Sequence, residues 1–371
     1  MRSDLKKMMD YCTFCPKMCR FSCPTAEATQ VETFTPWGKM EIGRWLVDKT
    51  LPLSQDLAAA LYQCTNCLHC QRYCEHDNDV PSALAEVRRI AVENYAAPPQ
   101  VYEIESRFAQ ANNPYGRDLY AEARSHWPDA VSEGWGEVLF FPSCHTLRHF
   151  PDRLGTYFEI FRKLSVEGVQ LIEPDLQCCG APLDALGFAG EFQEVAEVQY
   201  HALSRFKWVV TDGPECGHIL KKRYPQLSLP LGKQALHLME FLAPYFLNSN
   251  YRSRGKAKAR IAYHDPPYLS RYLGLSELPR RLLGELTGFA PLELTWSGED
   301  SLSAGTEGAY AWIFPEAAKK IARRTVEEVE SRGIGKLLTA DPLEEAMFKS
   351  LEPEFEVQDF FEFLNEQLLS E

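Results

Sequence analysis

Eight of the twelve cysteines in this chain lie in two short runs, so the fold must gather many thiols within small loops. The first run has the spacing C-x2-C-x3-C-x3-C-P and comprises Cys12, Cys15, Cys19 and Cys23. The second has the spacing C-x2-C-x2-C-x3-C and comprises Cys64, Cys67, Cys70 and Cys74. Runs of this kind are typical of paired [4Fe–4S] clusters, in which the last cysteine of each run ligates the other run's cluster. We therefore predict one cluster on Cys12, Cys15, Cys19 and Cys74, and a second on Cys64, Cys67, Cys70 and Cys23.

Zinc and disulfide bonds are the alternative uses of so many cysteines. A zinc site normally takes two CxxC pairs separated by a loop, with four ligands for each ion. Disulfide scaffolds are typical of secreted chains, and residues 1–7 contain no apolar segment of a secretory signal. Dense cysteine without such a signal favours metal binding in a reducing compartment, so we expect a cytoplasmic protein.

Length and charge narrow the classes of partner. A chain of 371 residues is long enough for two or three domains. Its net charge of −13 argues against nucleic-acid binding, which needs a basic surface. No apolar run approaches the roughly 18 residues of a membrane helix, so any membrane contact is expected to come through a partner.

Residues 1–97 are predicted to be helical, with helix-forming segments at 27–30, 56–62 and 82–92. About forty residues separate the two cysteine runs, which leaves room for helices between them. This pattern favours an α-helical ferredoxin domain. Residues 98–134 follow as a predicted connector, because Pro98 and Pro99 interrupt the helical pattern and residues 112–116 form a turn signal.

From residue 135 onwards the pattern changes to alternating strands and helices, which is typical of a parallel sheet covered by helices. Strands are predicted at residues 138–141, 170–172 and 208–211, and helices near 154–164 and 192–206. The order recurs after a basic segment at 251–258, with strands at 260–263 and 336–339 and a helix at 315–332. Residues 211–216 match residues 339–344. We therefore predict two repeats of one α/β unit, 135–248 and 259–371.

The four remaining cysteines are far apart in the sequence, but each follows a predicted strand. They are Cys144, Cys178, Cys179 and Cys216. Loops at the carboxyl ends of parallel strands converge on one crevice, so we expect these thiols to meet there and bind a third metal centre. Buried, inert thiols are the alternative.

With these two cysteine runs and the later cysteine set, the chain resembles a known group of proteins. It is similar to the iron–sulfur proteins related to heterodisulfide reductase, especially to the D-type subunit of that enzyme, and to the iron–sulfur subunits of glycolate and lactate oxidases. These proteins join a two-cluster ferredoxin module to two cysteine-rich repeats called CCG domains. The resemblance covers nearly the whole chain and includes the connector Asn113-Pro114-Tyr115-Gly116 and Trp127.

The resemblance implies a lone cysteine, then CCG, then C-P-x-C in each repeat. The first repeat keeps four of the five cysteines, with Gly213 in place of the fifth. The second repeat keeps none, because the corresponding positions hold Pro267, Ser303-Ala304-Gly305, Asp341 and Glu344. The four-cysteine remnant could hold a [4Fe–4S] cluster or zinc, and we expect the second repeat to hold no metal.

Two histidines flank the predicted third centre. His145 and His218 could each hydrogen-bond a cluster sulfur and raise its potential, although a histidine satisfied by other protein groups is the alternative. His264 belongs to the second repeat and carries no predicted role. Neither a GxGxxG nor a GxxxxGK[ST] motif is present, so nucleotide-binding fingerprints are missing.

These observations predict an α+β multidomain protein, in which an α-helical ferredoxin domain precedes two Rossmann-like α/β CCG repeats, the second degenerate. The resemblance implies an electron-transfer subunit that works with a flavoprotein, a dehydrogenase or a membrane or quinone-linked subunit. A heterodisulfide or quinone reductase acting at the CCG site is an alternative, as is the iron–sulfur subunit of a glycolate- or lactate-type dehydrogenase. No evident substrate pocket is expected in the chain itself.

Overall fold

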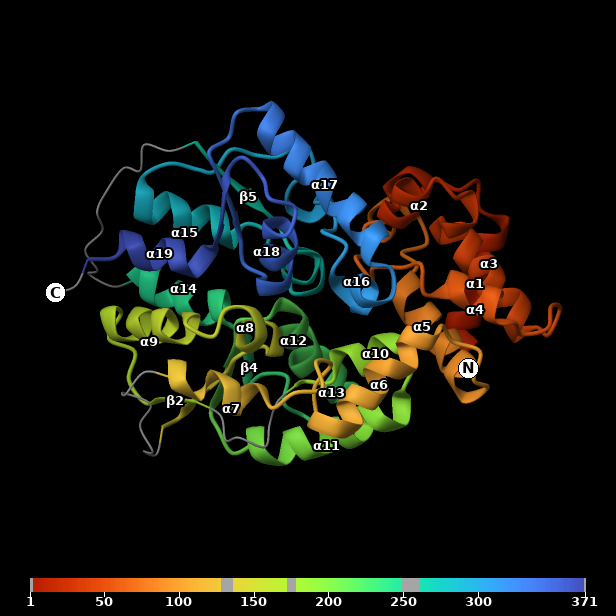
Figure 1. Cartoon of the computed structure of the whole chain (residues 1–371), viewed down its shortest axis with the longest axis horizontal. Coiled ribbons are helices and arrows are strands. Elements are labelled where there is room, and N and C mark those ends of the chain that lie inside the picture. The colour runs from red at the N-terminus through yellow and green to blue at the C-terminus, as the bar shows by residue number, and fades with distance from the viewer. Residues whose placement is uncertain (1–2, 128–135, 172–177, 249–259, 370–371) are drawn as a thin grey trace.

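The computed structural model describes residues 3–127, 136–171, 178–248 and 260–369. The basic segment at 251–258 and Ile172 at the end of a predicted strand therefore lie outside the described residues. Figure 1 shows the two sheet-containing halves of the chain one above the other, with the N-terminal helices gathered at one end of both.

The cysteine runs lie in a helical N-terminal part. Its helices are α1 (Ser3–Phe14), α2 (Pro24–Thr29), α3 (Pro36–Val47), α4 (Gln55–Leu61) and α5 (Val80–Glu93). Polar caps begin three of them, since Thr35 accepts from the Gly38 amide, Ser54 from the Leu57 amide and Asp79 from the Ser82 amide. The apolar faces of α1, α3 and α5 pack on one another around Met9, Met40 and Leu84. The helical character predicted for this part is confirmed.

The predicted connector is itself largely helical. It contains α6 (Pro99–Ala111) and α7 (Leu119–Ala123). Pro99 occupies the first turn of α6, where a missing amide hydrogen costs nothing, so the Pro-Pro pair ends one helical segment and begins the next. The buried face of α6 packs into the large core beside the first sheet through Val101, Ile104 and Phe108.

The first half contains a four-stranded parallel sheet in the order β2-β1-β3-β4. Its strands are β1 (Val138–Phe141), β2 (Val169–Leu171), β3 (Trp208–Thr211) and β4 (Ala235–His237). Its helices are α8 (Cys144–His149), α9 (Arg153–Lys163), α10 (Ala181–Leu186), α11 (Ala189–Leu203), α12 (Pro214–His218), α13 (Tyr224–Gln226) and α14 (Leu238–Asn248). Phe141 pairs with Thr211, so β1 and β3 end at the same edge.

The second half contains a three-stranded parallel sheet in the order β5-β6-β7. Its strands are β5 (Ile261–His264), β6 (Lys336–Thr339) and β7 (Glu356–Asp359). Its helices are α15 (Leu278–Thr287), α16 (Tyr310–Ile313), α17 (Pro315–Ser331), α18 (Pro342–Lys349) and α19 (Phe360–Gln367), with the π-helical turn η6 (Tyr268–Tyr272) and the 3-10 turn η8 (Glu307–Ala309). The predicted strands at 138–141, 208–211 and 336–339 are confirmed with the same bounds.

The two halves share one apolar core, which includes Phe140 from the first sheet and Phe361 from α19. Tyr157 of α9 meets Phe361 edge to face at 5.9 Å between ring centroids. On the other side, α17 packs on α2 of the N-terminal part. The second half therefore contacts both other parts of the chain.

Candidate metal centres

The first group of thiols contains two cysteines, one from each run, that contact the same asparagine. The side-chain amide of Asn78 donates to Cys12 Sγ at 3.3 Å, and its backbone amide donates to Cys74 Sγ at 3.5 Å. Burial raises the pKa of Cys12 to about 12, and Cys19, Cys74 and Cys15 are the thiols close enough to raise it further. The neighbours of Cys12 are thus the first-run cysteines 15 and 19 together with the last cysteine of the second run.

The second group lines one small cavity. Cys23, Cys64, Cys67 and Cys70 all face it, together with Thr25 and Lys39. The Lys39 ammonium donates to Cys23 Sγ at 3.5 Å, and Thr25 Oγ1 lies 3.2 Å from the same sulfur. The last cysteine of the first run therefore lies with the first three cysteines of the second run.

Left-handed backbone conformations shape both cysteine loops. Lys17 lies between Cys15 and Cys19 with φ of 64°, while Asn66 and Leu68 both have φ of 58° in the second run. Non-glycine residues adopt this conformation at a cost, and they persist in it where the surrounding structure demands it. These turns let closely spaced cysteines point inward from one loop.

The donor set of both groups fits iron–sulfur clusters, because thiolates are the soft ligands that such clusters take. Within each group, sulfurs from the two cysteine loops approach one another. The second group lines a cavity. No three His, Cys, Asp or Glu side chains within the described ranges lie close enough to chelate a single ion.

The third set of thiols lies at the carboxyl edge of the first sheet. Cys144 begins α8 after β1, Cys178 and Cys179 precede α10, and Cys216 lies in α12 after β3. The sulfurs form two close pairs, with Cys144 Sγ 3.9 Å from Cys178 Sγ and Cys179 Sγ 3.3 Å from Cys216 Sγ. All four side chains are buried. The structure thus brings together the four cysteines that sequence analysis placed at one crevice, and their role as ligands remains a prediction.

The surroundings of these thiols disfavour thiolates in the metal-free chain. Burial raises the pKa of Cys178 well above its ordinary value, and the hydrogen bond to Cys179 together with burial does the same for Cys216. The charged groups nearest to Cys216, Asp212 and Glu215, are acidic and act in the same direction. A metal centre here would have to displace protons and supply the positive charge itself.

Two glycines leave no room for side chains around this site. Gly180, directly after Cys179, has φ of +84°, and a Cβ there would lie 3.0 Å from the Phe192 ring. A Cβ on Gly213 would lie 2.8 Å from Ser143 Cβ and 3.1 Å from Cys216 Sγ. The position of the missing fifth cysteine is therefore occupied by backbone packed against Ser143.

Neither flanking histidine donates to a cysteine sulfur among the described contacts. His145 Nδ1 lies 2.8 Å from Tyr115 Oη, and burial lowers the pKa of His145 to about 3. His218 packs edge to face on Tyr272 at 4.5 Å, and burial lowers its pKa to about 3. Tyr115 comes from the connector motif, so this motif supports α8 from outside the sheet.

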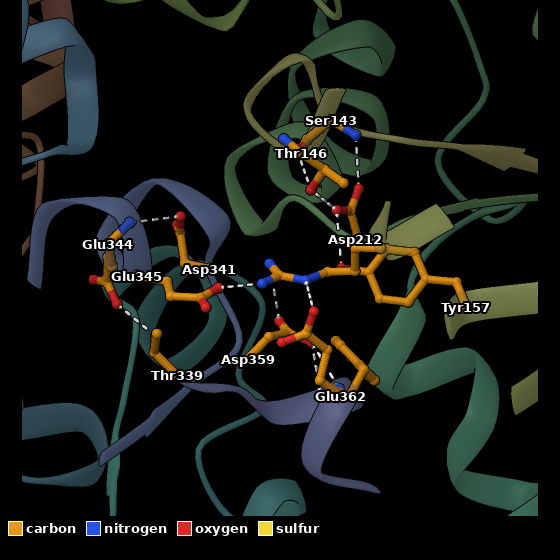
Figure 2. Close-up of polar contacts among 12 residues, drawn as sticks. Ser143, Thr146, Tyr157, Asp212, Thr339, Asp341, Glu344, Glu345, Asp359 and Glu362 are labelled. Atoms are coloured by element: carbon orange, nitrogen blue, oxygen red, sulfur yellow. Dashed lines mark hydrogen bonds and ion pairs between the residues drawn. The ribbon is translucent and has the colours of Figure 1, made fainter. Parts of the chain in front are cut away.

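A buried acidic cluster stands in the second half where the thiols are missing. Glu344 accepts from Thr339 Oγ1 at 2.9 Å and pairs with His264 Nδ1 at 3.0 Å, and Figure 2 shows the contact with Thr339. Asp341 caps α18 by accepting from the Glu344 amide at 3.2 Å. Glu307 accepts from Ser303, and the nearby charge of Glu344 adds to burial in raising the pKa of Glu307. Hard oxygen donors replace soft sulfur here, which does not fit an iron–sulfur cluster.

Two cavities lie near the third set of thiols, and the one that Cys216 itself lines has a volume of only about 10 Å³, room for no more than one water molecule. That cavity is also lined by Glu215, Tyr268, Glu307 and Asp341. A larger one lies where the N-terminal part and the two halves meet, and its lining includes Asn66, Arg89, His218 and Tyr272. No helix among the described residues is both long and apolar enough to span a membrane.

Comparison with known proteins agrees with this geometry. The 4Fe-4S dicluster domain family matches residues 8–78, and the cysteine-rich domain family, CCG, matches residues 138–221. The B-type subunit of the fumarate reductase (CoM/CoB) of Methanothermobacter marburgensis is 26% identical over 345 residues, which cover 91% of this chain and 67% of that protein. The D-type subunit of the dihydromethanophenazine:CoB–CoM heterodisulfide reductase of Methanosarcina mazei is 24% identical over 348 residues, covering 86% of this chain and 83% of the relative.

A solved structure shares the fold across most of the chain. The crystal structure of a hypothetical protein from Helicobacter pylori superposes with a TM-score of 0.54 at 8% identity, covering 98% of this chain and 75% of the other. The mixed helical and parallel-sheet architecture, the two cysteine runs and the convergent thiols all lie within the matched regions. The chain therefore contains a 4Fe-4S dicluster domain followed by a cysteine-rich CCG domain, and it is related to the D-type subunit of heterodisulfide reductase.

Proposed function

We propose that this chain is an electron-transfer subunit of a redox complex, relaying electrons between a flavoprotein or dehydrogenase partner and an acceptor. The observation that carries the proposal is the sorting of the eight N-terminal cysteines into two crosswise groups. One contains Cys12, Cys15, Cys19 and Cys74, and the other contains Cys23, Cys64, Cys67 and Cys70. When bound, each [4Fe–4S] cluster carries a single electron.

The chain's own residues connect the second group with the third set of thiols. The buried guanidinium of Arg88 donates to the Cys64 carbonyl at 3.4 Å and to the Ala185 carbonyl at 2.7 Å. Ala185 lies in α10, which begins directly after the CCG sequence. On the other side, Tyr272 Oη donates to the Asn66 carbonyl at 2.6 Å. This arrangement supports a relay that runs from the dicluster part into the first half.

We further propose four segments and their metal content. Residues 1–97 form the dicluster domain, 98–134 the connector, 135–248 the CCG domain, and 259–371 a degenerate second repeat with a Rossmann-like plan. The set Cys144, Cys178, Cys179 and Cys216 binds a third [4Fe–4S] cluster or zinc. We place the protein in the cytoplasm, peripheral to the membrane through a partner.

A small-molecule reductase is the second candidate function. The cavity beside Cys216 has a volume of only about 10 Å³, room for no more than one water molecule, so a disulfide or quinone does not fit there as the side chains stand. Gly213 argues against disulfide chemistry of the family type, since the fifth cysteine of the repeat is missing.

An anaerobic preparation tests the proposal. Iron and acid-labile sulfide analysis should give about eight atoms of each in the dicluster domain, and more if the third set of thiols also holds a cluster. A partner captured anaerobically should then reduce these clusters faster than free dithionite-reduced flavin does. Zinc in place of iron at residues 12–74, or a captured partner that exchanges no electrons with the chain, would contradict the proposal.

A further inference from the structure

A lysine with no acidic partner lies at the centre of the dicluster part. Lys39 is 1% exposed and extends from α3 into the cavity that the second group of thiols lines. Its ammonium donates to Cys23 Sγ at 3.5 Å, to Thr25 Oγ1 at 3.3 Å and to the Gln63 carbonyl. No carboxylate forms a salt bridge with Lys39 in the part of the chain that the structure describes.

A buried ammonium without counter-charge is strongly destabilising, so a native fold keeps one only when negative charge balances it. The negative charge available to Lys39 comes from cysteine. Cys23 Sγ lies 3.5 Å from the Lys39 ammonium, and Cys64 and Cys70 line the same cavity. These are ligands of one predicted cluster, and their combined thiolate charge is the counter-charge that the site needs.

The other thiol group has a different environment. Its hydrogen-bond donor is Asn78, a neutral amide that contacts Cys12 and Cys74. The cations near its surface, Lys17 and Arg20, both pair with Glu32 at 3.6 and 2.6 Å and are substantially exposed. Solvent and Glu32 screen these charges, whereas Lys39 is buried and its charge is screened much less.

A second cation approaches the same group as Lys39. Arg271 of η6 donates through Nε to the Cys67 carbonyl, and its Nη1 is held by the Glu299 and Ser301 carbonyls at 2.9 Å. The degenerate second half therefore adds positive charge beside the second thiol group. Adding an electron to a cluster adds negative charge, so nearby cations stabilise the reduced state and raise the reduction potential.

We propose that Lys39 is the counter-ion of the cluster on Cys23, Cys64, Cys67 and Cys70, and that it holds the potential of that cluster above the potential of the cluster on Cys12, Cys15, Cys19 and Cys74. In this transfer the cluster on Cys12, Cys15, Cys19 and Cys74 would give up one electron, and the cluster on Cys23, Cys64, Cys67 and Cys70 would accept it. No bond is made or broken. Because Arg88 connects Cys64 to α10, the electron rests on the side of the dicluster domain that faces the CCG thiols. The inference rests on the proposed cluster placement.

Redox titration of the isolated anaerobic protein, followed by electron paramagnetic resonance, tests this inference. The two signals are assigned with Cys19→Ser and Cys67→Ser. Lys39→Met should lower the potential of the Cys67 cluster enough to change the equilibrium distribution of the electron at least tenfold, which is 59 mV for a one-electron couple. Lys39→Arg should retain the wild-type order, because it keeps the charge. Asn78→Leu is the matched control and should move only the Cys19 cluster.

Each outcome decides the inference. Unchanged potentials in Lys39→Met, or a Lys39→Arg protein that behaves like Lys39→Met, would overturn it. Should Lys39→Met lose iron, loss confined to the Cys67 cluster and absent in Lys39→Arg supports the counter-ion role, whereas loss in both variants refutes it. No partner takes part in the measurement, so a failure of the proposed electron relay would leave the two potentials and their order unaffected.

Discussion

Arg153 in the first half and Glu345 in the second form an ion pair of 2.7 Å, with exposed side-chain fractions of 1% and 0%. The same guanidinium lies 3.0 Å from Glu362 and 3.8 Å from Asp359, so a single cation faces three carboxylates from α18, β7 and α19. Figure 2 shows these carboxylates gathered opposite Asp212, which itself accepts from Ser143, Thr146 and Tyr157 of the first half. Charge complementarity therefore joins the two sheet-containing halves.

Removing this cation should weaken the junction strongly. Arg153→Met removes the shared cation and leaves Glu345 with only Lys349 and Asp359 with only backbone amides as partners. We expect the free energy of unfolding to fall by about 3–5 kcal/mol. Denaturant titration followed by tryptophan fluorescence measures the change. Arg162→Met on the exposed face of the same helix is the control, with an expected change within about 0.5 kcal/mol. Equal effects of the two substitutions would contradict the prediction.

The buried carboxyl of Glu307 should make stability depend on pH. Burial, followed by the charge of Glu344, raises the pKa of Glu307 from 4.5 to about 8. The folded state therefore binds this proton more tightly than the unfolded state. Its stabilising contribution is complete below about pH 4.5 and is lost as the pH rises to about 8, at up to about 1.4 kcal/mol per pH unit.

Glu307→Gln should reduce the slope between pH 4.5 and 8, because the amide does not titrate. A slope remains, since burial also raises the pKa of Glu215 to about 7 and that of Asp359 to about 8. The groups around Glu307 are the Ser303 hydroxyl, Glu344 and Arg271, and the substitution leaves them in place. Thermal unfolding at several pH values measures the slope. Glu316→Gln, on a side chain that is 81% exposed, is the control and should leave the slope unchanged.

Crosswise ligation gives a prediction for the last cysteine of the second run. Cys74→Ser should damage the cluster of Cys12 and Cys19 and spare that of Cys64, because Asn78 places Cys74 beside Cys12. We expect a loss of up to about four iron atoms and of one paramagnetic signal. Cys67→Ser is the reciprocal control and should remove the other signal. Loss of the same signal in both variants would show that each run ligates its own cluster.

Sequence patterns located the inner strands and the edge strands β2 and β5, but missed the edge strands β4 and β7. Trp208–Thr211 and Lys336–Thr339 are central strands with apolar side chains, and their predicted bounds match the structure. Ala235–His237 and Glu356–Asp359 were missed, because edge strands this short and this polar carry no apolar run. Pairing with β3 and β6, rather than local propensity, makes them strands.

The sequence likewise predicted one part of the candidate sites, the cysteines, but not the side chains that surround them. Cysteine spacing alone identified the ligand candidates, because close thiols on one loop are a local signal. The roles of Lys39 and Arg271 were not foreseen, since each depends on how α3 and η6 pack against the cysteine loops. A Thr-Pro-x-Gly-Lys sequence gives no indication that its lysine is buried. Tyr115 was noted in a connector motif, but its contact with His145 depends on tertiary packing.

Restoring the fifth cysteine should fail for a steric reason. A Cβ on Gly213 would lie 2.8 Å from Ser143 Cβ, and Ser143 cannot move freely, because its amide donates to Asp212 at 2.6 Å and its hydroxyl caps α8. Gly213→Ala and Gly213→Cys should therefore both lower the free energy of unfolding by about 1–3 kcal/mol. Gly213→Cys should also add no iron.

Adding Ser143→Gly removes the clashing atom, so a double-mutant cycle should show favourable coupling between the two positions. A Gly213→Cys protein as stable as wild type, with more iron bound, would show that the site accepts a fifth thiolate and that the backbone packing seen here does not exclude it.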